Sequence, residues 1–378
     1  MRVAHFAKYT FVQLGGMERH VAILSKALAA HGIDVTVFAY DPSRRLEPGT
    51  VEGVRLEPIP PLLHLSSQAI APSLVSRARR IARTRPFDIV HQHWPDPFAH
   101  ITASMMPGNP AHVVTWHSDI VRQKLLRTAY HAIAPRFLVR PDALIGATQA
   151  HLNSSQLSLF APVERRHVIP YCIDSSPFAQ TPAVLQEAAS LRAAHGGGPL
   201  VFALGRHVYY KGFDILIRAM LQVSARLILG GDGPLTPALK QLAAELRAPV
   251  DFVGVIPEHS LPAYYYAFDV FCLPSSAKAE AFGLVQAEAM ACQKPIVNTF
   301  LANGVNELAP HTQCALTVPP ADVHGLRTAL RTLLDNPALA TSLGKAGYQR
   351  LHRHYNVDSM LRKTLTVYEH VLITKRST

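Results

Sequence analysis

Two glutamates, eight positions apart, stand where a short strand is predicted to give way to a helix. Glu280 follows the apolar run Asp269–Pro274, which has the length of a strand and stops at a proline. Glu288 falls within the helix that the apolar spacing after Gly283 predicts. The N–H groups of residues 282–285 would open that helix without intrahelical partners, at the positive end of its dipole. The pattern predicts an anion site, typically for phosphate, although two solvated glutamates beside a helix start would look the same.

Two cations follow the first predicted strand of the second half of the chain. Arg206 comes directly after the apolar run Leu200–Gly205, and Lys211 lies five positions further on, before a predicted helix. Two cations at this spacing in a loop suit a diphosphate that bridges them. The alternative is ordinary solvated surface charge.

The first half of the chain offers two comparable positions. Gly15 and Gly16 lie between the predicted strand Val3–Ala7 and the helix that follows, where missing side chains would let a ligand approach the backbone. His117 directly follows another predicted strand and precedes Asp119. A plain tight turn and a structural histidine are the alternatives, since the chain has 20 histidines.

Strand-like and helix-like segments alternate through both halves, which predicts α/β domains with parallel sheets covered on both faces. We expect a first domain over residues 1–178 and a second over residues 199–356. The proline- and glycine-containing tract 179–198 is predicted to link them and to contain a short helix. Residues 357–378 are predicted to form a helix that packs back towards the first domain. Ligands of such folds bind at the carboxyl ends of the strands.

Composition narrows the class of protein. The 378 residues are 48% hydrophobic and 17% charged, which is typical of folded domains. The net charge of +11 favours an anionic partner. The sequence shows no nucleic-acid-binding motif, no signal peptide and no apolar run long enough for a membrane span, so we expect a cytoplasmic protein that does not bind nucleic acid. Four scattered cysteines without a CxxC pair fit a reducing compartment.

Taken together and in this order, the motifs resemble those of the retaining glycosyltransferases of family 4. The most specific segments are Gly205–Gly212, Gly231–Pro234 and Glu280–Cys292, and the resemblance covers essentially the whole chain. The segment Val114–Lys124 is similar to a subgroup of bacterial enzymes that make lipopolysaccharide O-antigen. The resemblance implies the GT-B fold, in which two Rossmann-like doubly wound parallel-sheet domains face a central cleft.

The resemblance also implies a reaction and its partners. Enzymes of this subgroup transfer mannose or rhamnose from a nucleotide diphosphate sugar, often GDP-linked, to a saccharide that is often lipid-linked. Retention in the family is ascribed to front-face attack, in which the leaving phosphate accepts the proton of the acceptor. No cofactor and no metal are then required, and the sequence contains no Asp-x-Asp motif.

Roles for the donor side follow residue by residue from the resemblance. Arg206 and Lys211 would neutralise the diphosphate as it departs, Glu280 would bind a hydroxyl of the donor sugar, and Glu288 would bind the ribose. The N–H groups at the helix start would bind sugar and phosphate, and the loop after the third strand of the second domain would border the base. These last positions are Phe282, Gly283, Leu284, Val285 and Ile256.

Roles for the acceptor side are implied in the same way. Gly16 would border the donor sugar and the acceptor, and His117 would contact the donor sugar near the reacting carbon. The remaining acceptor-side positions are Gly15, Asp119, Arg122 and Lys124.

The sequence departs from the family pattern at three places near the donor side. Gln293 replaces a usual glycine, His311–Leu316 lacks the glycines of the usual Gly-x-x-Gly-Leu element, and Asn306 replaces a common proline. Because of these changes, the resemblance does not define the shape of the sugar pocket.

Two arginine-rich segments, Ser73–Arg85 and Ile120–Arg140, could lie on an anionic membrane surface or simply present solvated basic faces. We expect peripheral attachment to the inner face of the cytoplasmic membrane. Three other functions stay open: a UDP-sugar 2-epimerase, a UDP-sugar transferase with a soluble acceptor, and a nucleotide-sugar sensor without chemistry. A nicotinamide dehydrogenase is disfavoured because no G-x-G-x-x-G follows the first strand.

Overall fold

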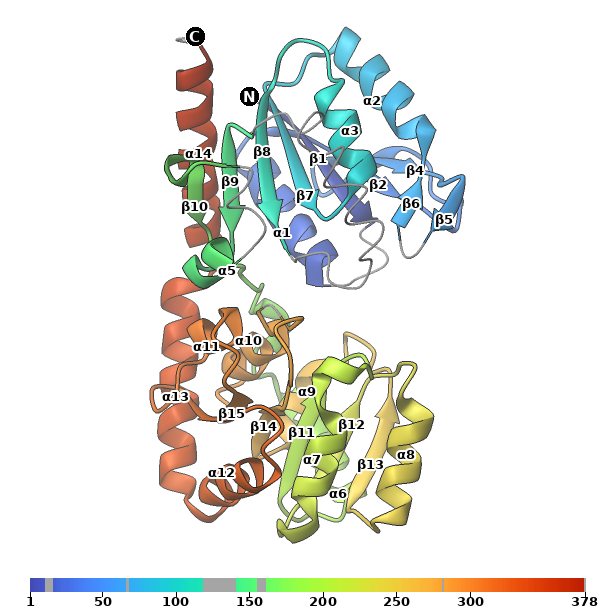
Figure 1. Cartoon of the computed structure of the whole chain (residues 1–378). Helices are drawn as coiled ribbons and strands as arrows, with labels where there is room; N and C mark the ends of the chain where they lie inside the picture. The colour runs from blue at the N-terminus through green and yellow to red at the C-terminus, as the bar shows by residue number, and fades with distance from the viewer. Residues whose placement is uncertain (11–15, 66–67, 118–140, 155–160, 281, 377–378) are drawn as a thin grey trace. The chain divides into compact units, whose positions relative to one another are not determined.

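The computed structural model describes residues 1–10, 16–65, 68–117, 141–154, 161–280 and 282–376. The chain forms two compact units, shown in Figure 1. Unit 1 comprises Met1–Cys172 and Val357–Thr378, and unit 2 comprises Ile173–Asn356. Residues 173–178, predicted for the first domain, therefore belong to unit 2. Among the described helices, none combines the length and the apolar character needed to cross a bilayer.

Unit 1 is built on an eight-stranded sheet with the order β10-β9-β8-β7-β1-β2-β4-β3. All neighbouring strands run parallel except β3 and β4. The order reverses between β1 and β7, and this is the topological switch point where doubly wound sheets bind ligands. The strands are β1 (Arg2–Tyr9), β2 (Asp34–Tyr40), β3 (Gly49–Val51), β4 (Val54–Ile59), β7 (Ile89–Trp94), β8 (Ala111–Trp116), β9 (Ala143–Gly146) and β10 (Arg166–Val168). A separate hairpin pairs β5 (Leu63–Leu65) with β6 (Gln68–Ile70).

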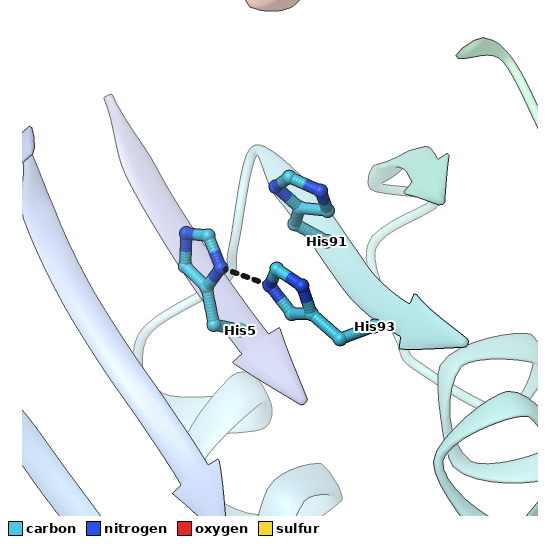
Figure 2. A group of neighbouring side chains, drawn as sticks. All are labelled: His5, His91 and His93. Carbon is cyan, nitrogen blue, oxygen red and sulfur yellow. Dashed lines mark hydrogen bonds between the residues drawn. The ribbon is translucent and has the colours of Figure 1, made fainter. Parts of the chain in front are cut away.

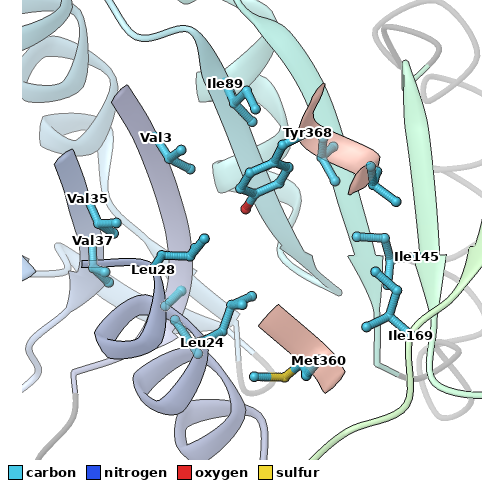
Figure 3. Close-up of a cluster of buried hydrophobic side chains, with 14 of the residues drawn as sticks. Val3, Leu24, Leu28, Val35, Val37, Ile89, Ile145, Ile169, Met360 and Tyr368 are labelled. Atoms are coloured by element: carbon cyan, nitrogen blue, oxygen red, sulfur yellow. The ribbon is translucent and has the colours of Figure 1, made fainter. Parts of the chain in front are cut away.

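Helices cover both faces of this sheet. On one face, α1 (Gly16–Ala30) and α14 (Val357–Arg376) share a core with the strands, to which Leu24, Leu28 and Tyr368 contribute (Figure 3). On the other face, α2 (Pro72–Thr84) and α3 (Pro97–Ser104) pack through small buried side chains such as Ala78 and Ala103. The unit also contains α5 (Gln149–Ser154) and the 3₁₀ turn η2 (Val163–Arg165). The C-terminal helix thus completes the core of the unit that contains the N-terminus.

Unit 2 is built on a six-stranded parallel sheet with the order β13-β12-β11-β14-β15-β16. Its switch point lies between β11 and β14. The strands are β11 (Leu200–Leu204), β12 (Arg226–Gly230), β13 (Val250–Gly254), β14 (Val270–Leu273), β15 (Ile296–Thr299) and β16 (Ala315–Val318). The sequence prediction of two Rossmann-like α/β units with parallel sheets is confirmed.

The helices of unit 2 pack on both faces of its sheet. One face shares an apolar core with α7 (Phe213–Ala219), α8 (Thr236–Glu245), α12 (Val323–Asp335) and α13 (Pro337–His354). The other helices are α6 (Pro182–Ala194), α9 (Leu261–Ala267), α10 (Leu284–Ala291) and α11 (Gly304–Leu308), and the 3₁₀ turns are η3 (Ser176–Phe178), η4 (Tyr209–Lys211) and η5 (Met220–Gln222). Most of the tract predicted as a linker, 179–198, forms α6, which packs against α9 within unit 2. Thr181 caps α6 by accepting from the Val184 N–H, so the short helix predicted inside this tract is present.

Candidate active site

The loops after β11 and β14 bring a lysine and a glutamate together at the switch point of unit 2. Lys211 Nζ lies 2.5 Å from Glu280 Oε2, and the two side chains are only 10% and 11% exposed. A buried pair of this kind holds both charges in place, because either one alone would lose its hydration without compensation. The structure thus joins two residues that the sequence assigned separately to diphosphate and to sugar.

Two glycines allow the lysine to reach this position. Gly212, between η4 and α7, has a φ of +65°, and a Cβ there would collide with the backbone oxygen of Pro274. A Cβ on Gly205 would lie 3.2 Å from Lys211 Nζ. The Lys211 side chain therefore passes close to the backbone at Gly205, where a larger residue would crowd it. The loops after β11 and β14 approach each other at Gly212, where a side chain would not fit.

The glutamate is held from two sides. Ser275 Oγ donates to Glu280 Oε2 at 3.2 Å, and Asn303 Nδ2 donates to the Glu280 backbone oxygen at 2.6 Å. A backbone bond of 2.7 Å from the Ser276 N–H to the Tyr210 oxygen joins the two loops. The carboxylate is therefore fixed in orientation, as a group that must recognise one sugar hydroxyl would have to be.

Helix α10 begins beside this pair. Gly283, with a φ of +70°, precedes its first residue, and the Gln286 N–H donates to the Gly283 oxygen at 2.8 Å. The N–H groups that precede Gln286 lie in the first turn, where intrahelical partners are lacking. Leu284 and Val285 are partly exposed there, whereas Phe282 is buried.

Glu288 lies one turn further into α10 and is buried. Tyr265 donates its hydroxyl proton to Glu288 Oε2 at 2.8 Å, and its oxygen lies 3.1 Å from the Val285 backbone oxygen. The tyrosine therefore ties the carboxylate to the first turn of the helix. Its predicted contact with a ribose stays a prediction.

Two further predicted donor-side residues lie at the same edge of the sheet. Arg206 follows β11 and is exposed. Ile256 lies over the carboxyl end of β12, because its Cδ1 would be 2.8 Å from a Cβ on Gly230. Arg206 and Lys211 thus offer one exposed and one buried cation beside a helix N-terminus, which is an arrangement suited to a diphosphate.

Sequence reasoning did not assign roles to Ser275, Asn303 or Tyr265, which support the two glutamates. Ser275 lies two residues beyond the end of β14 at the switch point, and that placement could have singled it out. Asn303 and Tyr265 lie far from their partners in the sequence, and no local pattern connects them to Glu280 and Glu288.

In unit 1, His117 directly follows β8 and is buried. Its Nδ1 lies 2.7 Å from the Tyr171 hydroxyl, and its Nε2 lies 3.0 Å from His93 Nδ1. Both ring nitrogens are thus bonded within unit 1, and the predicted contact of His117 with a donor sugar stays a prediction. Gly16 is the exposed first residue of α1.

The other acceptor-side predictions fall outside the residues that the structure describes. They are Gly15, Asp119, Arg122 and Lys124, and the same holds for the whole of the arginine-rich segment 120–140.

Comparison with known proteins decides the family. A model described as Glycosyltransferase Family 4 matches residues 14–176, and one described as Glycosyl transferases group 1 matches residues 198–336. The D-rhamnosyltransferase WbpZ of Pseudomonas aeruginosa is 30% identical over 93% of this chain and 92% of its own length. The chain belongs to glycosyltransferase family 4. The sequence prediction of the family is thereby confirmed.

A second relative covers nearly the whole glycosyltransferase chain. The O-antigen chain mannosyltransferase C of Escherichia coli is 26% identical over 99% of this chain and 100% of its own length. Both relatives therefore align with most of this chain, including both of its units.

Solved structures establish the fold. Sucrose-phosphate synthase from Thermosynechococcus elongatus superimposes with a TM-score of 0.83 at 21% identity, over 99% of each chain. Anabaena HepE in complex with UDP gives a TM-score of 0.78 at 19% identity, over 98% of this chain and 100% of its own. The glycosyltransferase has the GT-B fold, as the sequence predicted.

Proposed function

We propose that this glycosyltransferase moves a hexose of the mannose or rhamnose type from a GDP-sugar to a lipid-linked saccharide, with retention of configuration. Two observations support the sugar and the pathway class: one relative is a D-rhamnosyltransferase and another an O-antigen chain mannosyltransferase. A role in the synthesis of a cell-surface polysaccharide, such as lipopolysaccharide, follows from the same relatives.

The observation that carries the proposal is the Lys211–Glu280 pair at the switch point of unit 2. In the proposed complex, Lys211 and the exposed Arg206 contact the donor diphosphate, and Glu280 accepts a hydrogen bond from a sugar hydroxyl. The ion pair between Lys211 and Glu280 would then join the residue that binds the sugar to the residue whose charge stabilises the leaving diphosphate.

The proposed transfer needs no protein base. The bond from the anomeric carbon to the diphosphate breaks, the acceptor oxygen bonds to that carbon on the same face, and its proton passes to the departing phosphate oxygen. Arg206, Lys211 and the N–H groups at the start of α10 stabilise the negative charge on that phosphate. We therefore propose that the reaction proceeds without a metal ion. Undiminished turnover in excess EDTA is the expected result, and loss of turnover that Mg²⁺ or Mn²⁺ restores would contradict it.

Peripheral membrane attachment is part of the proposal. Arg77 and Arg85 already bond within unit 1, to Glu57 and Asp34 respectively. The outer face of α2 also carries three further arginines, Arg79, Arg80 and Arg83, of which the last two are exposed. A basic face of this kind would attract the anionic inner leaflet.

The direct test is a donor panel with product analysis. Purified protein is incubated with GDP-mannose, GDP-rhamnose, UDP-glucose and UDP-N-acetylglucosamine, with and without a lipid-linked saccharide acceptor. The proposal predicts slow release of GDP from one GDP-sugar, faster release with acceptor, and an α-linked product from an α-linked donor. Epimerised UDP-sugar would instead indicate an epimerase, and binding of a nucleotide sugar without turnover would indicate a sensor.

A further inference from the structure

Unit 1 contains a row of buried imidazoles at its own switch point. His5 on β1 pairs in register with His91 on β7, and His93 lies two residues further along β7. All three are fully buried. Because strand side chains alternate, they share the face that α1 and α14 cover, and Figure 2 shows the rings gathered there.

Head-on hydrogen bonds connect these rings to the end of β8. His5 Nδ1 lies 3.0 Å from His93 Nε2, and His93 Nδ1 lies 3.0 Å from His117 Nε2. The ring centroids of the two pairs are 5.3 Å and 5.2 Å apart. In each pair, the distance between the ring centroids exceeds the distance between the bonded nitrogens by about the width of one imidazole ring. The two bonded nitrogens therefore lie nearly on the line that joins the ring centroids, as in a straight hydrogen bond.

Two tyrosines and a threonine extend the row. Tyr171 bonds to His117 Nδ1 at 2.7 Å. At the other side, the Tyr368 hydroxyl of α14 lies 2.6 Å from His91 Nδ1 and 3.5 Å from His5 Nε2. His91 Nε2 in turn lies 2.7 Å from Thr115 Oγ1.

The rings stay neutral near pH 7. Burial, with the neighbouring His20, lowers the pKa of His5 to about 3. Burial and the surrounding histidines hold the pKa values of His91 and His93 well below the usual range. A neutral imidazole has one N–H and one bare nitrogen, so a ring that accepts on one side must donate on the other. For the bonds among the described residues, the row therefore has two arrangements in which every bond is made, and they run in opposite directions.

The tyrosine contacts select one direction. In the first arrangement, Tyr171 donates to His117 at 2.7 Å and Tyr368 donates to His91 at 2.6 Å. In the second, the ring N–H groups of His117 and His91 would make the same 2.7 Å and 2.6 Å contacts, and the two hydroxyl protons would go to the Trp116 backbone oxygen at 3.4 Å and to His5 at 3.5 Å. Contacts of 2.6 Å and 2.7 Å are shorter than the roughly 2.9–3.0 Å that is typical of an N–H donor and fit an O–H donor, so the first arrangement is favoured.

We propose that Tyr368 on α14 sets the tautomer of His117 through His5 and His93. In the favoured arrangement all four rings carry their proton on Nε2. The His5 Nε2–H then points to the Tyr368 oxygen, which is the acceptor that ends this part of the row. Tyr368, His5 and His93 are thus positioning residues for the imidazole at the carboxyl end of β8.

Removing the Tyr368 hydroxyl leaves the buried His5 N–H without that acceptor. A shift of three protons restores the bonds: His5 donates from Nδ1 to His93, His93 donates from Nδ1 to His117, and His117 donates from Nδ1 to Tyr171. Each ring loses a proton at one nitrogen and gains one at the other, so the charge does not change. The inference concerns only this coupling and is independent of which sugar the enzyme transfers.

Nuclear magnetic resonance of ¹⁵N-histidine-labelled full-length protein tests the coupling, because long-range ¹H–¹⁵N correlations distinguish the two tautomers. The wild type should show His5, His91, His93 and His117 protonated on Nε2. In Tyr368→Phe, the proton of His117 should move to Nδ1. Tyr40→Phe is the matched control: Tyr40 is buried in the same unit, but its hydroxyl bonds to Asp96 outside the row.

Four results would overturn the inference. One is a His117 that keeps its Nε2 proton in Tyr368→Phe, and another is a His117 proton that moves to Nδ1 in Tyr40→Phe. The third is an Nδ1 proton on any of the four rings of the wild type, which is decisive even if the variant does not fold. The fourth is a stoichiometric transition metal in the purified protein that His93→Gln removes, because a metal would take the nitrogens that the row needs.

Discussion

The two units share one architecture but place their polar groups differently at the switch point. In unit 2, the strands that meet there carry apolar side chains into the core, such as Val201 and Cys272, and the charges lie in the loops beyond. In unit 1, the equivalent strands β1 and β7 carry histidines inside the layer that α1 and α14 cover. The charged residues of unit 2 thus lie in loops at the edge of its sheet, whereas the uncharged histidines of unit 1 lie inside its core.

This difference separates two kinds of polar site. Lys211 and Glu280 form an ion pair in which each charge compensates the other, and Lys211 can also contact an arriving anion. The imidazoles of unit 1 are bonded to one another and are kept neutral by burial. We therefore expect unit 2 to respond to ligand and unit 1 to respond to acid.

Acid should give the largest contrast between the units. Six histidines of unit 1 have folded-state pKa values below the ordinary 6.5: His5 at about 3, His20 and His112 at about 4, His91 and His93 well below the usual range, and His167, whose pKa burial also lowers. Below about pH 6.5 the unfolded chain binds protons that the folded unit excludes, so stability falls as the pH falls towards these values. Each histidine removes about 1.4 kcal/mol per pH unit over its window.

One group in unit 1 acts in the opposite sense. Burial raises the pKa of Asp96 to about 6, so this carboxyl favours the folded state on acidification between about pH 6 and pH 4. It is one carboxyl group against six histidines. Both tryptophans, Trp94 and Trp116, lie in unit 1, so tryptophan fluorescence reports that unit alone. The fluorescence transition should precede loss of hydrogen-exchange protection in unit 2 as the pH falls from 6.5 to 4.5. Simultaneous unfolding of both units, or none, would contradict the contrast.

Loss of either cation at the unit 2 switch point should reduce turnover strongly. Arg206→Ala and Lys211→Ala should each lower kcat on the order of 10²-fold or more, because they remove charge that stabilises the leaving diphosphate. Lys211→Ala should also lower stability by about 3–5 kcal/mol, since it leaves the buried Glu280 unpaired. Arg206 is exposed, so its replacement should leave the thermal midpoint nearly unchanged.

The matched control for these variants is Arg218→Ala, which removes an exposed arginine from α7 in the same unit. Steady-state kinetics and thermal denaturation of the three variants separate the two roles. Near wild-type turnover in both Arg206→Ala and Lys211→Ala would refute the diphosphate assignment.

The basic face of α2 should matter only for membrane binding. Replacing Arg79, Arg80 and Arg83 by serine should weaken binding to vesicles with anionic lipid by about 1 kcal/mol per arginine, with no loss of soluble-acceptor turnover. Cosedimentation with vesicles measures this, and vesicles of neutral lipid provide the baseline. A triple replacement of exposed arginines in unit 2 removes the same charge and serves as the control; these are Arg218, Arg331 and Arg353. Equal binding of the two triple variants would exclude a specific role for α2.

The smallest expected effect on activity comes from removing the hydrogen bond that Tyr265 donates to Glu288. Tyr265→Phe removes the hydroxyl that donates to this carboxylate at 2.8 Å, at a net cost of about 1 kcal/mol. If Glu288 binds the ribose, KM for the donor should rise a few-fold while kcat stays close to the wild-type value. A changed kcat with an unchanged KM would place Glu288 at the reacting centre instead.

Much of the fold followed from local pattern. The strands β1, β2, β11 and β14 are apolar runs bounded by turn residues, and the helices between them have clear apolar faces. The tract 179–198 was harder, because prolines and glycines surround a helix whose few buried residues give a weak apolar stripe. Its docking against α9 is a long-range contact that local pattern does not encode.

Some residues of the candidate site could likewise be predicted from local pattern, and others could not. Arg206, Lys211 and Glu280 could be predicted because each follows a strand that ends at the switch point. Their ion pair could not, since it depends on the approach of two loops at Gly212. Of the imidazole row, only His117 was singled out from the sequence. There His5, His91 and His93 are only polar residues in apolar strands, and their register with one another appears only in the sheet.

Calorimetric titration with GDP tests the central claim most directly, that the charged switch point of unit 2 binds the donor diphosphate. The wild type and Arg218→Ala should bind GDP equally. Arg206→Ala should bind it about 10-fold more weakly or worse, as expected for the loss of a charge-assisted hydrogen bond worth about 1.5–3 kcal/mol. Equal affinity of Arg206→Ala and Arg218→Ala for GDP would contradict the account.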